Sequence, residues 1–295
     1  MTSVARTREA RPAVTAKGRG RASRGERSAW WIYIPLVIGL LILIGPFIWM
    51  LLGSFKTTAE LRQLPPTWIP EHPTLDNFRR LFERLSFPRY FFNSALVAAA
   101  VTAGNLIFCS MLGYALAKLR FPGKRVLFLL VLGMLMVPGM VTFVPLFVLI
   151  ANLGLANTHA GLILPFLAGP FGVFLMRQFI AGLPDELLDA ARVDGAGEYY
   201  IFARIILPLT KPALATLGIL TFLASWNNFL WPLVVAQTED MYTLPVALAL
   251  VSRGQNQTDF GLLLAGAVIV ILPVLIVFLV LQRFFTQGIA MTGFK

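Results

Sequence analysis

Long apolar stretches, separated by short polar segments, run along most of the chain. Five of them contain no Asp, Glu, Lys or Arg, and they cover 31–55, 90–117, 126–176, 212–238 and 260–282. At about 1.5 Å per residue, about 20 helical residues cross a hydrocarbon core of about 30 Å. The third stretch is too long for one crossing, and the Asn- and Gly-rich segment 151–161 predicts a break within it. Alternating strand patterns are absent, so only helices suit these stretches. We predict an all-α integral membrane fold with six transmembrane helices, at about 31–53, 91–117, 126–150, 160–180, 212–236 and 260–283.

The composition agrees with a membrane protein. The chain has 295 residues, of which 57% are apolar and 13% are charged, and its mean hydropathy is +0.75. Soluble domains carry about 25% charged residues. The one cysteine, Cys109, lies within an apolar stretch. A disulfide framework within the chain is therefore excluded, and we expect Cys109 to be a small packing residue.

The distribution of basic residues predicts the orientation of the chain in the membrane. An even number of crossings places both termini on one side, and 18 of the 25 Lys and Arg residues then lie on that side. Because basic residues are enriched in cytoplasmic loops, we expect a multi-pass protein of the cell (plasma) membrane with both termini in the cytoplasm. The net charge of +11 is interpreted largely as this signal, and no nucleic-acid binding is expected. Residues 1–29 are basic and poor in apolar side chains, which predicts a disordered cytoplasmic tail before one membrane domain, 30–295.

The largest segment expected outside the cell is 54–89. Its stretch "LPPTWIP", 64–70, predicts a rigid extended or turn piece. The stretch "TLDNFRRLFERL", 74–85, predicts a short amphipathic helix that Thr74 or Asp76 caps. The apolar residues expected on one face of this helix are Leu75, Phe78, Leu81, Phe82 and Leu85. Two interpretations stay open: a helix that lies at the membrane surface, and a docking site for an external partner.

The chain lacks the residues that would let it drive uphill transport without a partner. Its predicted spans contain almost no ionisable side chains, whereas proton- and voltage-coupled machines usually bury such groups. A phosphate-binding G-x-x-x-x-G-K-[ST] loop is missing, because "FPGKR" at 121–125 has no glycine five residues before Gly123. With two histidines and one cysteine, neither a catalytic nor a metal site is expected. We expect another subunit to supply the energy, although a carrier that binds sodium through backbone carbonyls at broken helices stays open.

A polar segment, 181–211, separates the fourth and fifth predicted spans and carries a helical pattern. Pro184 suits the first position of a helix, and acidic residues follow in the first turn, where the helix dipole favours them. Gly195 can adopt a left-handed conformation and end this helix. A second helix is expected from about Gly197, limited near Leu207 by the proline that follows. One stripe of that helix is expected to contain Tyr199, Phe202 and Ile206. The pattern predicts a rigid cytoplasmic helix–turn–helix.

The same loop resembles the permease subunits of ATP-binding-cassette (ABC) importers. Their pattern is Glu-Ala-Ala, three residues, Gly, nine residues and Ile-x-Leu-Pro. This chain keeps the spacing but has Asp189 in place of the usual glutamate. The residues that match the pattern or its commoner extended form are Asp189, Ala190, Ala191, Asp194, Gly195, Ala196, Phe202, Ile205, Leu207 and Pro208. The resemblance implies that 181–211 is a coupling loop, whose helix seats in a cleft of an ATPase subunit.

The C-terminal half is similar to that of the maltose-type carbohydrate permeases. The likeness lies in "SWNNFLWPLVVAQTEDMYTLPVAL", 225–248, in 261–285 and in the terminal "GIAMTGFK". It implies an importer of sugars, oligosaccharides or related polyols and glycerophosphates. It further implies a second, different permease, two ATP-binding-cassette ATPase subunits and an extracytoplasmic solute-binding protein. ATP and Mg would then be bound by the ATPase, with no cofactor on this chain, which is not an enzyme by itself.

Six side chains are candidates for a solute path, because sugars need amide partners and aromatic faces. They are Trp226, Asn227, Asn228, Trp231, Asn105 and Ser110. The two tryptophans also suit an interfacial aromatic belt, and the asparagines also suit hydrogen bonds to neighbouring helices. The alternatives to a sugar importer are an importer of another solute, such as an amino acid or a metal, a self-sufficient carrier or channel, and a membrane scaffold.

Overall fold

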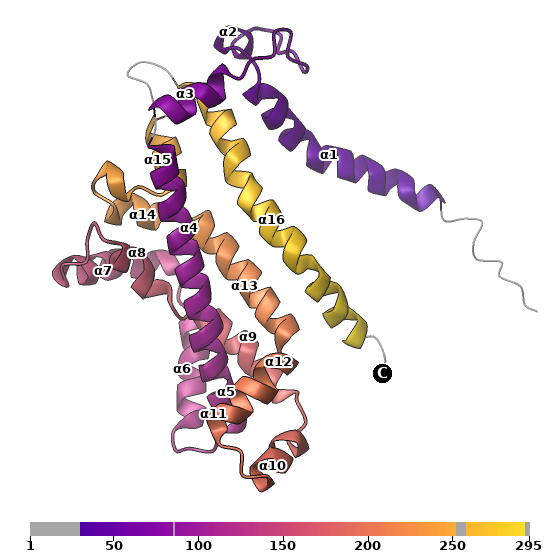
Figure 1. The fold of residues 1–295 in the computed structure, drawn as a ribbon, viewed down its shortest axis with the longest axis vertical. Coiled ribbons are helices and arrows are strands. Elements are labelled where there is room, and N and C mark those ends of the chain that lie inside the picture. Colours follow the sequence, from indigo (N-terminus) through magenta and orange to yellow (C-terminus); the bar gives the residue numbers. More distant parts are fainter. Residues whose placement is uncertain (1–29, 85, 252–257, 293–295) are drawn as a thin grey trace, which may run out of the picture. The chain divides into compact units, whose positions relative to one another are not determined.

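The computed structural model describes residues 30–84, 86–251 and 258–292, so the predicted disordered tail 1–29 lies outside the described residues. All regular elements of the described residues are helical, which confirms the all-α prediction. The chain divides into two units, Met1–Ile48 and Trp49–Lys295. The described part of the first unit is helical and belongs to α1 (Trp30–Ser54). The second unit contains all the elements that follow α1 (Figure 1).

Within the described residues, four helical segments are long and apolar enough to cross a membrane: Tyr33–Ser54, Phe87–Lys118, His159–Ala181 and Phe260–Val280. Two bent helix pairs bring the number to six if each pair is one span. The predicted spans 31–53, 91–117 and 260–283 fall within α1, within the run from α4 (Phe87–Gly104) to α5 (Ser110–Lys118), and within α16 (Phe260–Thr292). The other three predicted spans are each interrupted.

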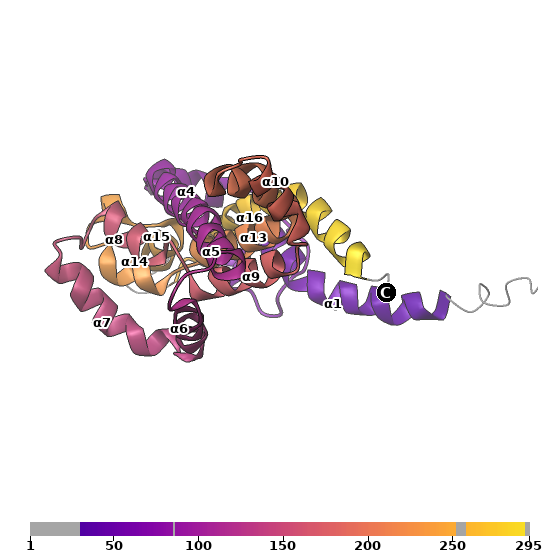
Figure 2. The same ribbon diagram turned by 90° about the horizontal axis from the view of Figure 1, so that it is seen from below.

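The third predicted span, 126–150, is not one helix. It consists of α6 (Lys124–Met136) and α7 (Gly139–Asn152), which meet at an angle of 104° (Figure 2). Pro138 causes the break, because it lacks an N–H group and disfavours helical geometry in the residue before it. Val137 accordingly has an extended conformation, with ψ 119°.

The fourth and fifth predicted spans also contain breaks. The region 160–180 consists of α8 (His159–Ile163), a 3-10 turn η3 (Leu164–Phe166) and α9 (Pro170–Ala181). The region 212–236 consists of α13 (Lys211–Trp226) and α14 (Leu230–Val235). Three further short elements are η5 (Glu239–Met241), α15 (Leu244–Val251) and α2 (Thr58–Leu61).

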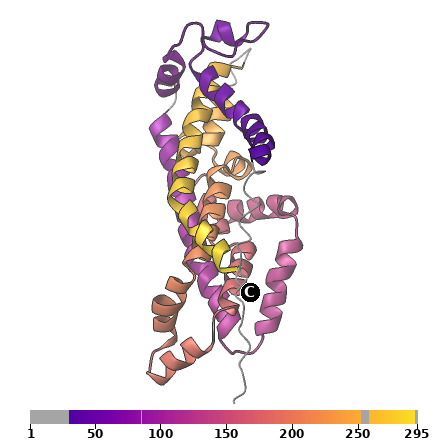
Figure 3. The same cartoon turned by 90° about the vertical axis from the view of Figure 1, so that its right-hand side faces the viewer.

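The centre of the second unit is a layer of closely packed helices. A π-helical turn, η2 (Asn105–Cys109), joins α4 to α5, so that they form one long element. Helix α9 packs on α5, α13 packs on α4, and α16 packs on α13 (Figures 1 and 3). Small residues permit this proximity: a Cβ added to Gly113 of α5 would lie 2.7 Å from Cβ of Met176 in α9.

The predicted amphipathic helix exists as α3 (Asp76–Arg84). Thr74 caps it, because its Oγ1 accepts a hydrogen bond of 3.1 Å from the amide of Asp76. The prediction of one shared apolar face is only partly right. Leu81 is completely buried, whereas Leu75 and Phe82 are 66% and 51% exposed. Helix α3 packs on α16, so it is integrated into the fold.

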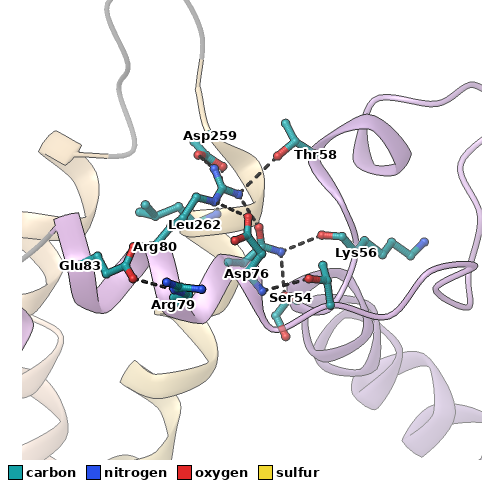
Figure 4. Close-up of polar contacts among 11 residues, drawn as sticks. Ser54, Lys56, Thr58, Asp76, Arg79, Arg80, Glu83, Asp259 and Leu262 are labelled. Carbon is teal, nitrogen blue, oxygen red and sulfur yellow. Dashed lines mark hydrogen bonds and ion pairs between the residues drawn. The ribbon is translucent and has the colours of Figure 1, made fainter.

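Polar side chains of α3 join the ends of two membrane helices (Figure 4). Asn77 donates from Nδ2 to the carbonyls of Ser54 and Lys56, at 2.8 and 2.7 Å, where α1 ends. Arg80 lies 2.7 Å from Oδ2 of Asp259, whose Oδ1 accepts a bond from the Leu262 amide at the start of α16. Two helix ends are thereby fixed to one short helix.

Candidate functional site

The segment 181–211 forms the predicted helix–turn–helix. The first helix is α10 (Glu186–Val193), and a turn leads to α11 (Glu198–Ile201). A second π-helical turn, η4 (Phe202–Ile206), and α12 (Leu207–Leu209) continue α11 without interruption. The segment then bends by 79° into α13, so the loop is fused directly to a membrane helix (Figure 1).

Gly195 closes α10 in the left-handed conformation that the sequence predicts, with φ +82°. The amide of Ala196 donates to the carbonyl of Ala191 at 2.9 Å, and the amide of Gly195 donates to that of Arg192 at 3.0 Å. These two bonds are the Schellman pattern, which satisfies the last carbonyls of a helix. The turn between the two helices therefore has a defined geometry.

One buried side chain fixes α10 to the membrane helices. All eight residues of α10 are described, and Leu188 is the buried one, at 1% exposure. It belongs to an apolar cluster with Tyr114 of α5, Ile180 of α9 and Ile201 of α11. This cluster extends to Cys109, so side chains in contact run from the loop 181–211 to the π-helical turn η2.

Ionic contacts surround this apolar attachment. Lys118 at the end of α5 lies 2.5 Å from Oδ1 of Asp185 and also donates to the Leu183 carbonyl at 2.6 Å. The hydrogen bond from Lys118, together with its charge, holds the pKa of Asp185 below its usual value. Arg192 bonds to Glu198 at 2.9 Å, and Glu198 in turn accepts a hydrogen bond from the Tyr114 hydroxyl. Both helices of the loop are thereby linked to each other and to α5.

The second helix ends at Leu209, close to the limit predicted near Leu207. The predicted stripe of Tyr199, Phe202 and Ile206 is not found, because Tyr199 is 84% exposed whereas Ile206 is completely buried, as is Ile201. The buried residues are five positions apart because the turn η4 is π-helical, and the sequence interpretation assumed the spacing of an α-helix.

The predicted coupling residues divide between the surface and the interior of the loop. Asp189, Ala190, Asp194, Gly195 and Pro208 are exposed. Ala191, Ala196, Phe202, Ile205 and Leu207 are partly buried. Two large side chains outside this pattern, Val193 and Tyr199, are 88% and 84% exposed.

A cavity of about 470 Å³ lies where the breaks of the fourth and fifth spans meet. Three of the six predicted path residues line it, namely Asn105, Asn228 and Trp231. Thr221 and Ser225 of α13 add hydroxyl groups that the sequence interpretation missed. The remaining lining residues are mostly apolar and come from α4, α6, the segment 162–172, α13 and α14. Such a surface, with a few polar groups, suits a bound solute.

The other three predicted path residues do not line this cavity. Trp226 is 2% exposed and donates to the Val270 carbonyl of α16 at 3.0 Å. Ser110 is completely buried and donates to carbonyls of its own helix. Asn227 donates to the Leu223 carbonyl of α13 at 3.0 Å. Because Trp226 and Trp231 are both 2% exposed, the alternative of an interfacial aromatic belt is wrong for them.

Two of the three residues that line the cavity, Asn105 and Trp231, make hydrogen bonds between spans. Asn105 donates to the carbonyls of Val101 and Phe166, at 3.0 and 2.6 Å. Its Oδ1 accepts from the amide of Gly169 at 3.0 Å. Trp231 donates from Nε1 to the Gly161 carbonyl at 3.1 Å.

A helical membrane protein with a rigid loop fused to a membrane helix, and a cavity between broken spans, belongs to the class of transport proteins. Residues 109–290 match the family described as binding-protein-dependent transport system inner membrane component, and the chain belongs to this family.

Known proteins resemble nearly the whole chain. The arabinooligosaccharides transport system permease protein AraQ of Halalkalibacterium halodurans is 43% identical over 272 residues, which are 90% of this chain and 96% of that protein. The diacetylchitobiose uptake system permease protein NgcG of Streptomyces coelicolor is 33% identical, over 94% of this chain and 92% of that protein. A solved bacterial ABC transporter involved in the import of the acidic polysaccharide alginate has a chain with a TM-score of 0.79 and 26% identity, covering 89% of this chain and 98% of that chain.

Proposed function

We propose that this chain is a permease subunit of an ATP-driven importer of a sugar or oligosaccharide. The observation that carries the proposal is the likeness, over 90% of the chain, to a permease named for arabinooligosaccharide transport. The cavity supports it, since Asn228, Thr221 and Ser225 offer polar groups of the kind that a sugar needs. We assign the solute path to this cavity.

The energy reaches the cavity through the coupling loop. In this proposal the exposed side of α10, including Asp189, Ala190 and Asp194, seats in a cleft of an ATPase subunit that binds ATP and Mg. Movement of that subunit displaces α10, and Leu188 transmits the displacement to the helices that it contacts. The helix that follows α10 leads directly into α13, and α13 forms one wall of the cavity. The complete importer contains this chain, a second, different permease, two ATPase subunits and an external solute-binding protein.

Reconstitution tests this proposal. We expect the purified chain in vesicles to show no ATP hydrolysis and no uphill uptake. Adding the second permease, the ATPase and the binding protein from the same source should give ATP-dependent uptake of an arabino-oligosaccharide or a chitobiose derivative. Uptake of an amino acid or a metal ion in place of every sugar would refute the sugar assignment. Accumulation by the lone chain on a sodium gradient would favour the carrier alternative.

A labelling experiment tests the orientation, with both termini and the coupling loop in the cytoplasm. Val193→Cys places a thiol on the loop, where the native side chain is 88% exposed. We expect a membrane-impermeant maleimide to label it only after the cells are permeabilised. Leu64→Cys is the matched control, since Leu64 is also 88% exposed but lies in the segment expected outside. Labelling of Val193→Cys in intact cells would show that the loop lies outside the cell. The predicted orientation and the proposed coupling role would then both be wrong.

A further inference from the structure

Two prolines interrupt the fourth span and leave two backbone carbonyls without their helical donors. In a helix, each carbonyl accepts from the amide four residues later. Pro165 would be the donor to Gly161, and Pro170 would be the donor to Phe166, but proline has no N–H group. An unsatisfied carbonyl in the hydrocarbon region costs several kcal/mol, so both carbonyls need another partner.

The amides three residues later, which serve in a 3-10 turn, are also engaged elsewhere. The Leu164 amide donates to Ala160 and not to Gly161. The Gly169 amide donates to Oδ1 of Asn105 and not to Phe166. Neither carbonyl therefore receives a bond from these positions of its own helix.

Side chains from two other spans supply the missing donors. Trp231 donates from Nε1 to the Gly161 carbonyl at 3.1 Å, and Asn105 donates from Nδ2 to the Phe166 carbonyl at 2.6 Å. Asn105 also accepts from the Gly169 amide, and the Cys109 thiol lies 3.4 Å from its Oδ1. The Asn105 amide thus has partners on both its nitrogen and its oxygen, all of them within the protein.

We propose that Asn105 and Trp231 are positioning residues of the translocation cavity. They replace the two backbone hydrogen bonds that Pro165 and Pro170 remove, and they hold the interrupted fourth span as the cavity wall. Their polar groups are directed to the protein backbone rather than to the solute. The link to transport rests on the proposed function, whereas the structural role does not.

The surrounding packing supports a fixed arrangement of the wall. A Cβ added to Gly104 would lie 3.0 Å from the Leu167 carbonyl oxygen, and one added to Gly172 would lie 2.7 Å from the sulfur of Cys109. The backbone around the break therefore lies directly against the π-helical turn that contains Asn105. A shift of the break would separate these surfaces and open the buried thiol of Cys109 to solvent.

The native cysteine provides a test that needs no solute. The assembled transporter, with its partner subunits, is treated with N-ethylmaleimide, and the peptide containing Cys109 is quantified by mass spectrometry. Cys109 is completely buried, so we expect slow labelling of the wild type. We expect roughly tenfold faster labelling of Asn105→Leu, because the Phe166 carbonyl and the Gly169 amide then lose their buried partner. Asn105→Asp, which keeps an acceptor for Gly169 but loses the donor to Phe166, should also label faster.

Thr102→Val is the matched control, because Thr102 donates to Ala98 within its own helix. It should label at the wild-type rate. Wild-type labelling of Asn105→Leu would overturn the proposal for Asn105, whether or not the solute is a sugar.

A rescue experiment tests Trp231. Trp231→Phe keeps a ring against Phe143 and Phe166 but removes the donor to Gly161. We expect it to slow ATP-dependent uptake by several-fold. In α-helical geometry residue 165 donates to the Gly161 carbonyl, so Pro165→Ala supplies the missing N–H group and should relieve the defect in the double variant. A double variant no faster than Trp231→Phe would overturn the role assigned to Trp231, and a defect that differs between two sugars would indicate direct solute contact instead.

Discussion

Gly195→Val is expected to reduce ATP-dependent uptake severely while the protein still inserts at near-normal levels. Gly195 has φ +82°, a region in which a side chain costs about 1–2 kcal/mol. No atom lies within 4 Å of the position of an added Cβ, so the cost arises from the backbone conformation alone. A cost of this size lowers the population of the native turn, relative to relaxed conformations of the loop, by roughly 5–30-fold.

The functional effect follows from what the turn holds together. If the turn relaxes, the bond from the Ala196 amide to Ala191 is lost, and α10 tilts relative to α11. A loop that must fit a cleft in the ATPase then transmits movement poorly. We expect the ATPase either to co-purify weakly or to hydrolyse ATP without uptake.

Two variants control this prediction. Gly197 has φ −73° and ψ 158°, an ordinary extended conformation, so Gly197→Val should be milder. Gly195→Asn should retain most uptake, because asparagine tolerates the left-handed region. Full uptake by Gly195→Val would mean that the loop is merely a connector and that the coupling argument is wrong.

The sequence predicts the parts of the fold that depend on local chemistry. The charge-free stretches locate α1 and the α4–α5 run within a few residues, and they locate the start of α16, which continues to Thr292. The sequence around Gly195 predicts the turn between α10 and α11, because glycine adopts the φ of +82° found there without strain. Signals of this kind are local and can be read from one sequence.

The breaks within the spans depend on more than local chemistry. A proline inside an apolar stretch indicates a disturbance, yet α1 continues through Pro35 and Pro46. Pro138, by contrast, turns the chain by 104° between α6 and α7. Tertiary contacts decide between these outcomes, and a single sequence does not display them.

The solute path illustrates the same limit. Sequence reasoning selects polar and aromatic residues in spans, and three of the six do line the cavity. It cannot tell that Asn105 and Trp231 donate hydrogen bonds to backbone carbonyls that lie 61 and 70 positions away in the chain. The π-helical turns at 105–109 and 202–206 also change which residues share a face, and no sequence pattern predicted them.

Leu188→Ala is expected to uncouple ATP hydrolysis from uptake. Leu188 is 1% exposed and is the buried side chain of α10, whose eight residues are all described. Truncating a buried leucine to alanine costs about 2–5 kcal/mol, because the apolar contacts are lost and a cavity remains. The exposed side of α10 is unchanged, so the ATPase should still bind and hydrolyse ATP.

The matched control for this variant is its neighbour in the same helix. Leu187 is 45% exposed, so Leu187→Ala should leave the thermal stability of the purified permease close to that of the wild type. Any effect of that variant should be confined to the affinity for the ATPase. Leu188→Ala should instead lower the unfolding temperature and the amount of solute imported per ATP, while ATPase co-purification persists. If Leu188→Ala kept the normal ratio of solute to ATP, movement of α10 would not reach the cavity through this side chain, and the ionic contacts of Lys118 and Arg192 would have to transmit it.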